Sequence, residues 1–129
     1  MARKRRFCIV GLGRLGSAYL NFRHFDPAEF ELIAGFDCNV PRTETLKSPV
    51  PLYPVYKMAE IITRFSIEAA LLCVPETAAQ HTAEALVSAG IRGILNFTPA
   101  TLILPPEITV RNASVTDELR ALSEHITAG

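Results

Sequence analysis

The chain lacks several features that mark whole classes of protein. No apolar run approaches the roughly 18 residues that a membrane-spanning helix needs. The three cysteines, Cys8, Cys38 and Cys73, have no Cys-x-x-Cys or other metal-binding spacing. The three histidines have no carboxylate or hydroxyl partner at a spacing that indicates catalysis. We therefore expect no membrane insertion, no metal site and no catalytic residues.

Net charge is absent as well, because 13 basic side chains balance 13 acidic ones. The charges are unevenly placed: residues 3–6 are all basic, and the rest of the chain carries nine basic and thirteen acidic side chains. Four charges at a chain end attract phosphates only weakly and in a salt-sensitive way. We interpret residues 1–6 as a solvated basic tail. No long apolar segment follows them, so a signal peptide is not indicated and a cytoplasmic location is expected.

What remains is a soluble α/β pattern. With 129 residues, 49% hydrophobic and 20% charged, the chain is long enough for a single domain, 1–129, with its own core. Strand-like and helix-like segments alternate, which predicts a Rossmann-type doubly wound, mainly parallel sheet. The expected strands are 6–11, 31–36, 52–55, 68–74, 91–96 and 108–110. The expected helices are 14–25, 57–65 and 75–89, with a single turn near 42–47.

The most informative segment is a glycine motif after the first expected strand. Gly11, Gly13 and Gly16 form Gly-x-Gly-x-x-Gly at a strand-to-helix junction. Gly11 permits the tight turn, Gly13 lets a pyrophosphate approach the backbone, and Gly16 lets the helix pack closely on the strand. The helix N-terminus offers N–H groups to the phosphates. We therefore predict a pyrophosphate-binding segment made of Gly11, Leu12, Gly13, Arg14, Leu15 and Gly16.

An acidic residue follows at the spacing expected for a ribose contact. Asp37 stands 21 residues after Gly16 and closes the apolar run 32–36. Its carboxylate would accept hydrogen bonds from the adenosine ribose and repel a 2′-phosphate, which favours NAD over NADP. Arg42 is near enough to soften that preference. The alternative is that Asp37 merely begins a polar turn.

Two expected helices carry apolar stripes. The helix 14–25 places Leu15, Ala18, Phe22 and Phe25 on one face. At the end of the chain, Ser114-x-x-Asp117 is a capping-box variant, and an apolar stripe follows at helical spacing: Val115, Leu119, Leu122 and Ile126. Such a terminal helix folds back on its own sheet or packs on another subunit. Periodicity alone favours packing within the chain.

Several segments together carry a resemblance to a known family. Residues 8–18 (CIVGLGRLGSA) and 93–100 (GILNFTPA) are similar to the Rex family of bacterial NAD(H)-sensing transcriptional repressors. Further matches lie at 34–37, 71–80 and 118–123, so the resemblance covers nearly the whole chain from about residue 5. Rex proteins join an N-terminal winged helix to a Rossmann domain. They are homodimers that exchange the C-terminal helix and release DNA when NADH closes the dimer.

The resemblance implies a non-enzymatic NAD(H)-binding, redox-sensing domain. It places the pyrophosphate at Gly11–Gly16 and the adenosine ribose at Asp37, with Cys38 beside it. It also makes the helix 114–127 an exchanged homodimer arm, which overrides the preference from periodicity. The nicotinamide half of the cofactor would contact Cys73, Val74, Pro75, Asn96, Phe97 and Thr98.

The chain also departs from the family's pattern. Only residues 1–6 precede the first expected strand, so we expect no winged helix and no sequence-specific DNA binding by this chain alone. In some Rex proteins a tyrosine on the first helix reads the nicotinamide redox state through an aspartate ahead of the exchanged helix. The matching positions here are Phe22 and Ser114, so both partners of that switch are replaced. Regulation through a protein partner stays open.

Two other functions stay open. A small NAD(P)-dependent oxidoreductase would need a substrate pocket and a general acid or base, for which few residues remain once six strands are built. A coenzyme A-binding Rossmann protein would use the same phosphate turn. Asp37 disfavours that ligand, because the adenosine ribose of coenzyme A is phosphorylated.

Overall fold

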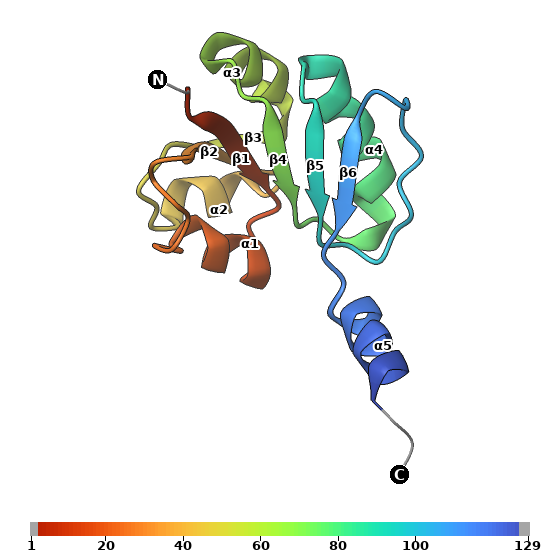
Figure 1. Ribbon diagram of the computed structural model, residues 1–129. Coiled ribbons are helices and arrows are strands. Elements are labelled where there is room, and N and C mark those ends of the chain that lie inside the picture. The colour runs from red at the N-terminus through yellow and green to blue at the C-terminus, as the bar shows by residue number, and fades with distance from the viewer. Residues whose placement is uncertain (1–2, 127–129) are drawn as a thin grey trace.

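The computed structural model describes residues 3–126, and its centre is one sheet of six parallel strands (Figure 1). The strand order is β3-β2-β1-β4-β5-β6. The strands β2 and β3 are added on one side of β1 and the last three strands on its other side, so the switch point of the sheet lies between β1 and β4. The predicted doubly wound parallel sheet is confirmed. The strands are β1 (Arg5–Val10), β2 (Phe30–Asp37), β3 (Leu52–Pro54), β4 (Ala69–Leu72), β5 (Gly93–Asn96) and β6 (Thr109–Asn112).

The helices lie on both faces of the sheet, and each face has its own apolar core. Cys8 and Val10 of β1 face α3 and α4, whereas Phe7 and Ile9 face the side that α1 covers. This alternation follows from the twofold side-chain period of a strand, and it explains why the central strands are apolar on both faces. The helices are α1 (Arg14–Leu20), α2 (Val40–Thr45), the 3-10 helix η1 (Val55–Lys57), α3 (Met58–Phe65), α4 (Glu76–Ala89) and α5 (Val115–His125).

The first helix differs from its prediction in length and in the face that it buries. It ends at Leu20 rather than near residue 25, and its buried residues are Gly16 and Leu20. Leu15 and Phe22, predicted to share an apolar face, are 44% and 42% exposed. The reason is the close approach at Gly16, which turns the Gly16 side of the helix toward β1. The 3.6-residue period then carries Leu20 to the same side.

The basic segment at the start of the chain is only partly the predicted solvated tail: residues 3–5 are exposed, but three of the four basic side chains are bonded to the body of the protein. Residues 1–2 lie outside the described part. Arg5 and Arg6 begin β1. Arg3 and Arg5 both bond to the Glu68 carboxylate at 2.9 Å, and Arg6 donates to the Phe65 carbonyl at 2.7 Å. Glu68 immediately precedes β4, so these bonds tie the amino ends of the two central strands together.

The last helix stands away from the sheet (Figure 1). Ser114 Oγ caps it by accepting a hydrogen bond from the Asp117 N–H at 3.1 Å, as the capping-box pattern predicts. None of the residues of α5 is buried, and the stripe residues Val115 and Leu119 are 75% and 58% exposed. Packing on its own sheet, which periodicity alone favoured, is therefore wrong. Residue 127, the predicted end of the helix, lies outside the described residues.

Within residues 3–126, no helix is long and apolar enough to cross a membrane.

We predict opposite effects of alanine at two glycines of the motif. A Cβ at Gly16 would overlap the Gly11 carbonyl, which is backbone and cannot step aside. Gly16→Ala should therefore lower the free energy of unfolding by about 3 kcal/mol or more. Gly13→Ala should change it by less than about 1 kcal/mol, because a Cβ at Gly13 meets no heavy atom within 4 Å among the described residues. Urea unfolding followed by circular dichroism measures both. Equal losses would contradict this packing.

Candidate functional site

The glycine motif forms a tight turn between β1 and α1. Gly11 has a φ of +94°, which favours glycine, and its N–H donates to the Phe36 carbonyl at 2.8 Å. A Cβ at Gly11 would lie 2.6 Å from the Cys73 carbonyl, and one at Gly16 would overlap the Gly11 carbonyl. Gly11 and Gly16 are thus required by the fold itself. Gly13 is exposed, and among the described residues no heavy atom lies within 4 Å of the position that a Cβ would take there.

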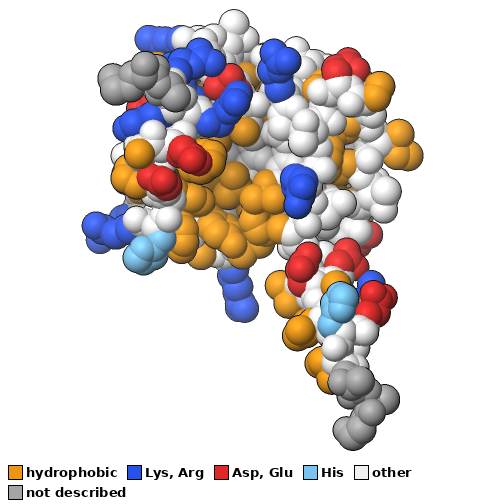
Figure 2. Space-filling view, viewed as in Figure 1, with side chains coloured by type: hydrophobic (Ala, Val, Ile, Leu, Met, Phe, Trp, Pro, Cys, Tyr) orange, Lys and Arg blue, Asp and Glu red, His pale blue; other side chains and the backbone are white. Residues whose placement is uncertain are grey.

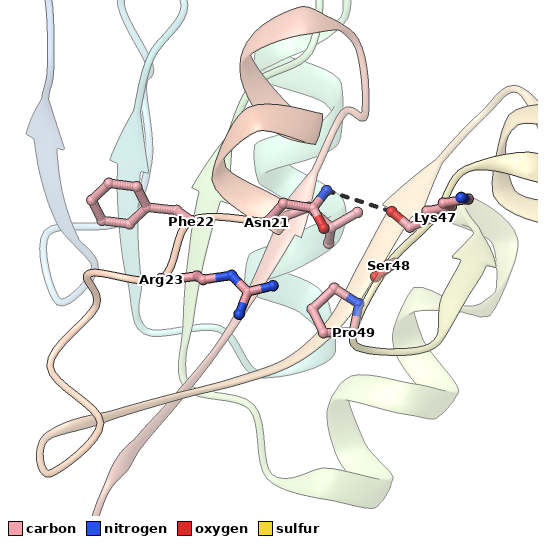
Figure 3. Close-up of a pocket in the computed structure, with 7 residues that line it drawn as sticks. Asn21, Phe22, Arg23, Lys47, Ser48 and Pro49 are labelled. Atoms are coloured by element: carbon pink, nitrogen blue, oxygen red, sulfur yellow. Dashed lines mark hydrogen bonds between the residues drawn. The ribbon is translucent and has the colours of Figure 1, made fainter.

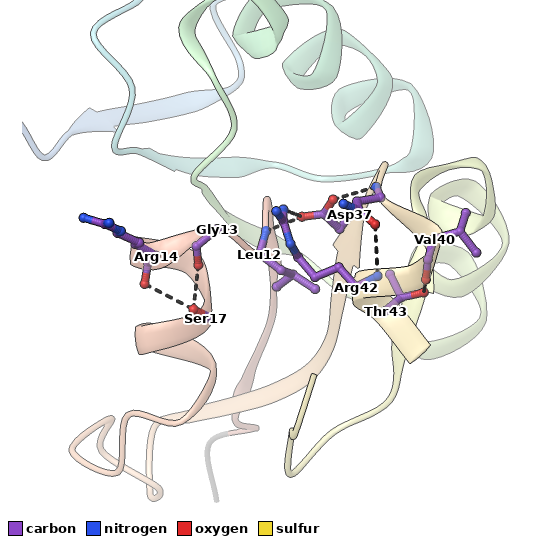
Figure 4. Close-up of polar contacts among 9 residues, drawn as sticks. Leu12, Gly13, Arg14, Ser17, Asp37, Val40, Arg42 and Thr43 are labelled. Carbon is purple, nitrogen blue, oxygen red and sulfur yellow. Dashed lines mark hydrogen bonds and ion pairs between the residues drawn. The ribbon is translucent and has the colours of Figure 1, made fainter. Parts of the chain in front are cut away.

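Asp37 is held beside this turn by three donors (Figure 4). It is only 4% exposed. Its Oδ2 accepts a 2.6 Å hydrogen bond from the Leu12 N–H, and its Oδ1 accepts one of 2.7 Å from the Asn39 N–H. Arg42 forms an ion pair with Oδ2 at 3.2 Å. The carboxylate therefore joins the end of β2 to the glycine turn, and its charge is compensated in its buried position.

The carboxyl ends of β4 and β5 meet the same turn. The Cys73 N–H donates to the Val10 carbonyl at 2.7 Å, and the Phe97 N–H donates to the Leu72 carbonyl at 3.0 Å. Val74 and Pro75 follow Cys73 into the start of α4. The Phe97 ring packs on Tyr19 of α1 with centroids 5.0 Å apart. The segments predicted to hold the two halves of a dinucleotide thus lie along one edge of the sheet, around the switch between β1 and β4.

Two predicted contact residues use their side chains inside the protein. Asn96 is 1% exposed and donates to the Ala100 carbonyl and to Asn112 Oδ1, at 2.9 and 3.0 Å. Its own Oδ1 accepts from the N–H and the hydroxyl of Thr98, at 3.0 and 2.7 Å. The Thr98 hydroxyl in turn accepts from the Ala100 N–H at 3.2 Å. These two side chains fix the shape of the loop after β5 and have few free positions for a ligand.

The other predicted contact residues differ in what they expose. The Leu12 side chain is 2% exposed and belongs to the core, so only its backbone faces the site. Arg14 and Cys38 are exposed, and Leu15 is 44% exposed. Sequence reasoning missed the Leu12–Asp37 bond, because a single carboxylate carries no signal of which backbone N–H it meets.

Two hollows are lined in part by residues near the C-terminal end of α1, Leu20 for one and Tyr19 for the other. One, of about 420 Å³, is lined by the residues after α1 and by Lys47, Ser48 and Pro49 (Figure 3). It lies at the opposite end of α1 from the glycine turn and holds none of the predicted contact residues. The other, of about 400 Å³, lies between the body and α5 and includes Tyr19, Phe97 and Ser114. It adjoins the predicted nicotinamide region and is walled on one side by the exposed stripe of α5.

Burial suppresses the acidity of two thiols. It raises the pKa of Cys8 to about 12 and that of Cys73 to about 11, from an ordinary value of 9.0. Cys73, beside the glycine turn, is therefore a neutral thiol at physiological pH, and it presents neither a charge nor a nucleophile to the site.

These features define a Rossmann-type α/β domain: a parallel sheet in the order 3-2-1-4-5-6, a glycine turn at the switch point and a carboxylate at the end of β2. The chain belongs to the CoA binding domain family, whose family model matches residues 2–100.

The predicted resemblance to Rex is confirmed. The chain is 41% identical over 114 residues to the redox-sensing transcriptional repressor Rex of Limosilactobacillus reuteri (strain DSM 20016), covering 88% of this chain and 53% of the relative. It is also similar to three crystal structures of the Rex-family repressor RSP, each at 36% identity and a TM-score of 0.84. RSP with β-NAD+ and operator DNA is covered to 55%, and RSP with β-NADH to 58%, each over 93% of this chain. The chain thus spans about half the length of the relatives it matches.

We predict that the three thiols differ in reactivity. Cys38 is exposed, so iodoacetamide at about pH 8 should modify it first, leaving Cys8 and Cys73 until the protein unfolds. Intact mass spectrometry over time counts the modified thiols. Rapid modification of all three thiols would contradict this burial.

Burial of Cys8 and Cys73 also predicts how the free energy of unfolding depends on pH. Because the pKa values of these thiols are raised in the folded protein, the unfolded chain loses their protons first, and stability should fall as pH rises from about 9 toward 11 or 12.

Proposed function

We propose that this chain is an NAD(H)-binding, redox-sensing domain that carries out no chemistry on its cofactor, as the regulatory part of a Rex-type repressor does. The observation that carries the proposal is the open space at Gly13. The fold needs glycine at positions 11 and 16 for close packing, but nothing among the described residues occupies the Cβ position of Gly13. Glycine there is explained by a ligand that lies against the backbone.

The residues around this space fit a dinucleotide. The segment Gly11–Gly16 would hold the pyrophosphate, with Arg14 exposed beside it. Asp37, with Cys38 next to it, would accept the adenosine ribose. The nicotinamide half would lie along Cys73, Val74 and Pro75 and the loop Asn96, Phe97 and Thr98, where the Phe97 ring and backbone are better placed to contact it than the engaged Asn96 and Thr98 side chains.

The groups at this edge support binding without catalysis. The Asp37 carboxylate is engaged by Leu12, Asn39 and Arg42. The pKa of Cys73 is raised to about 11, which leaves it protonated. A general acid or base needs an accessible proton near the nicotinamide, which a buried carboxylate held by three donors does not offer. The Cys73 thiol, with its raised pKa, does not give up a proton near neutral pH.

We predict that NADH binds and that Gly13→Val abolishes binding without unfolding the protein. The valine side chain would occupy the space proposed for the pyrophosphate, whereas the fold leaves that position empty. Isothermal titration calorimetry with NADH measures the affinity, and circular dichroism confirms folding of the variant. Lys57→Val, at the 3-10 helix on another part of the chain, is the matched control and should bind normally. Unaltered NADH binding by Gly13→Val would overturn the site.

We further propose that α5 is the arm of a homodimer. Its apolar stripe is exposed over Val115, Leu119, Leu122 and Ile126. Figure 2 shows hydrophobic side chains gathered on the sheet face beside α1, just above α5. Leu95 and Phe97 lie on this face and are only half buried. A second copy would bury both surfaces, which is the usual fate of exposed apolar patches of this kind.

We predict that Leu119→Asp with Leu122→Asp yields monomers. Both side chains are more than half exposed, so the charges should not disturb the body of the protein, but they would be buried without partners in a dimer. Analytical ultracentrifugation gives the oligomeric state. Glu124→Lys, on the same helix but outside the stripe, serves as the control and should stay dimeric. Monomeric wild-type protein, or a dimer that survives the double substitution, would contradict the arm.

Coenzyme A is a second candidate ligand, favoured by the family to which residues 2–100 belong. It would use the same turn for its diphosphate. Competition between NADH and coenzyme A in the same calorimetric experiment distinguishes the two, and our proposal expects NADH to bind more tightly.

A further inference from the structure

One cation stands between the ribose-binding carboxylate and solvent. Arg42 Nη1 lies 3.2 Å from Asp37 Oδ2, and its side chain is 42% exposed while that of Asp37 is 5% exposed (Figure 4). The local fold places it there: Asn39 Oδ1 accepts from the Arg42 N–H at 3.0 Å and so starts α2 directly after Asp37. The guanidinium is thus held at the mouth of the Asp37 site by its own helix cap.

The acceptor positions of Asp37 explain why this matters. A carboxylate accepts about four hydrogen bonds, two on each oxygen. Oδ2 accepts from the Leu12 N–H and from Arg42, and Oδ1 accepts from the Asn39 N–H. The two N–H groups belong to the backbone and are fixed. A ribose that uses both oxygens must therefore displace Arg42, the one donor on an exposed and flexible side chain.

The displaced guanidinium would remain beside the ribose hydroxyls. An isolated aspartate at this position rejects a ribose phosphate by charge repulsion. Here the pair has no net charge, and a guanidinium forms strong charge-assisted hydrogen bonds with phosphate oxygens. The same residue that competes with an unmodified ribose for Asp37 is thus a ready partner for a phosphorylated one.

On the basis of the proposed NAD(H) function, we infer that Arg42 determines specificity at the ribose end of the site: it lowers affinity for NAD(H) and admits a 2′-phosphate, so that the site accepts NADP(H) as well. Asp37 alone would give a strict preference for NAD(H) over NADP(H), and Arg42 beside it makes that preference narrow. The ligand class is an adenosine dinucleotide with or without phosphate on that ribose.

The test compares NADH and NADPH by titrating their fluorescence with wild-type protein, Arg42→Ala and Arg42→Gln. We expect the wild type to bind the two within about tenfold of each other. Both variants should weaken NADPH binding by about tenfold or more, the loss of one charge-assisted bond to phosphate. NADH binding should tighten in Arg42→Ala, which frees the Asp37 oxygen that Arg42 occupies. Arg42→Gln keeps a donor for Asp37 and guards against local unfolding. Lys47→Ala removes an exposed charge from the same stretch of chain and should leave the ratio unchanged.

The possible results distinguish the role of Arg42 from the proposed NAD(H) binding. A wild type that binds NADH but shows the same NADH-to-NADPH ratio, within about twofold, as both Arg42 variants would overturn the role of Arg42 and leave the proposed function standing. Wild-type protein that binds neither nucleotide would overturn both. Raising the salt concentration should weaken NADPH binding to the wild type more than to Arg42→Ala, because the contact is ionic and partly exposed.

Discussion

The structure depends on one close approach of backbone to backbone, where β1 passes into α1. Gly16 lets α1 lie against the Gly11 carbonyl, and Gly11 in turn lies against the Cys73 carbonyl after β4. This approach brings together the turns after β1 and β4, at the switch point of the sheet. It also sets the rotation of α1, so that Leu20 enters the core and Leu15 faces outward. The arrangement of the candidate site at the carboxyl ends of the strands follows from this packing.

The Asp37 carboxylate adds the second constraint. By accepting from the Leu12 N–H at 2.6 Å it fixes the glycine turn to β2, and by pairing with Arg42 it keeps a buried charge compensated. A group that we propose to bind ribose therefore also has a structural role. This dual role implies that substitutions of Asp37 will mix stability with affinity, because they leave the buried Leu12 N–H without its partner. Arg42 separates the two effects better, since it is exposed and contributes no buried backbone contact.

Sequence reasoning succeeded where the signal is local. The order strand, glycine turn, helix and acid predicted the strands and the switch point, because these depend on neighbours in the chain. It also predicted that Asp37 ends β2 beside the glycine turn, but not the bond of its carboxylate to the Leu12 N–H. It missed the ion pairs of the basic segment, since Glu68, which bonds to Arg3 and Arg5, lies more than sixty residues away. It also mistook the buried face of α1, which packing at Gly16 sets. The internal hydrogen bonds of Asn96 were invisible because Asn112 reaches it only through sheet pairing.

The central claim is that the open space at Gly13 and the adjoining carboxyl edge bind NADH. Titration of ¹⁵N-labelled protein with NADH, followed by ¹H–¹⁵N correlation NMR, tests it residue by residue. We predict that the largest shifts fall on the N–H groups of Gly13, Arg14 and Leu15, with further shifts at Cys38 and Phe97. Shifts confined to the amino edge around Arg5 and Glu68, or no saturable shifts at all, would contradict it.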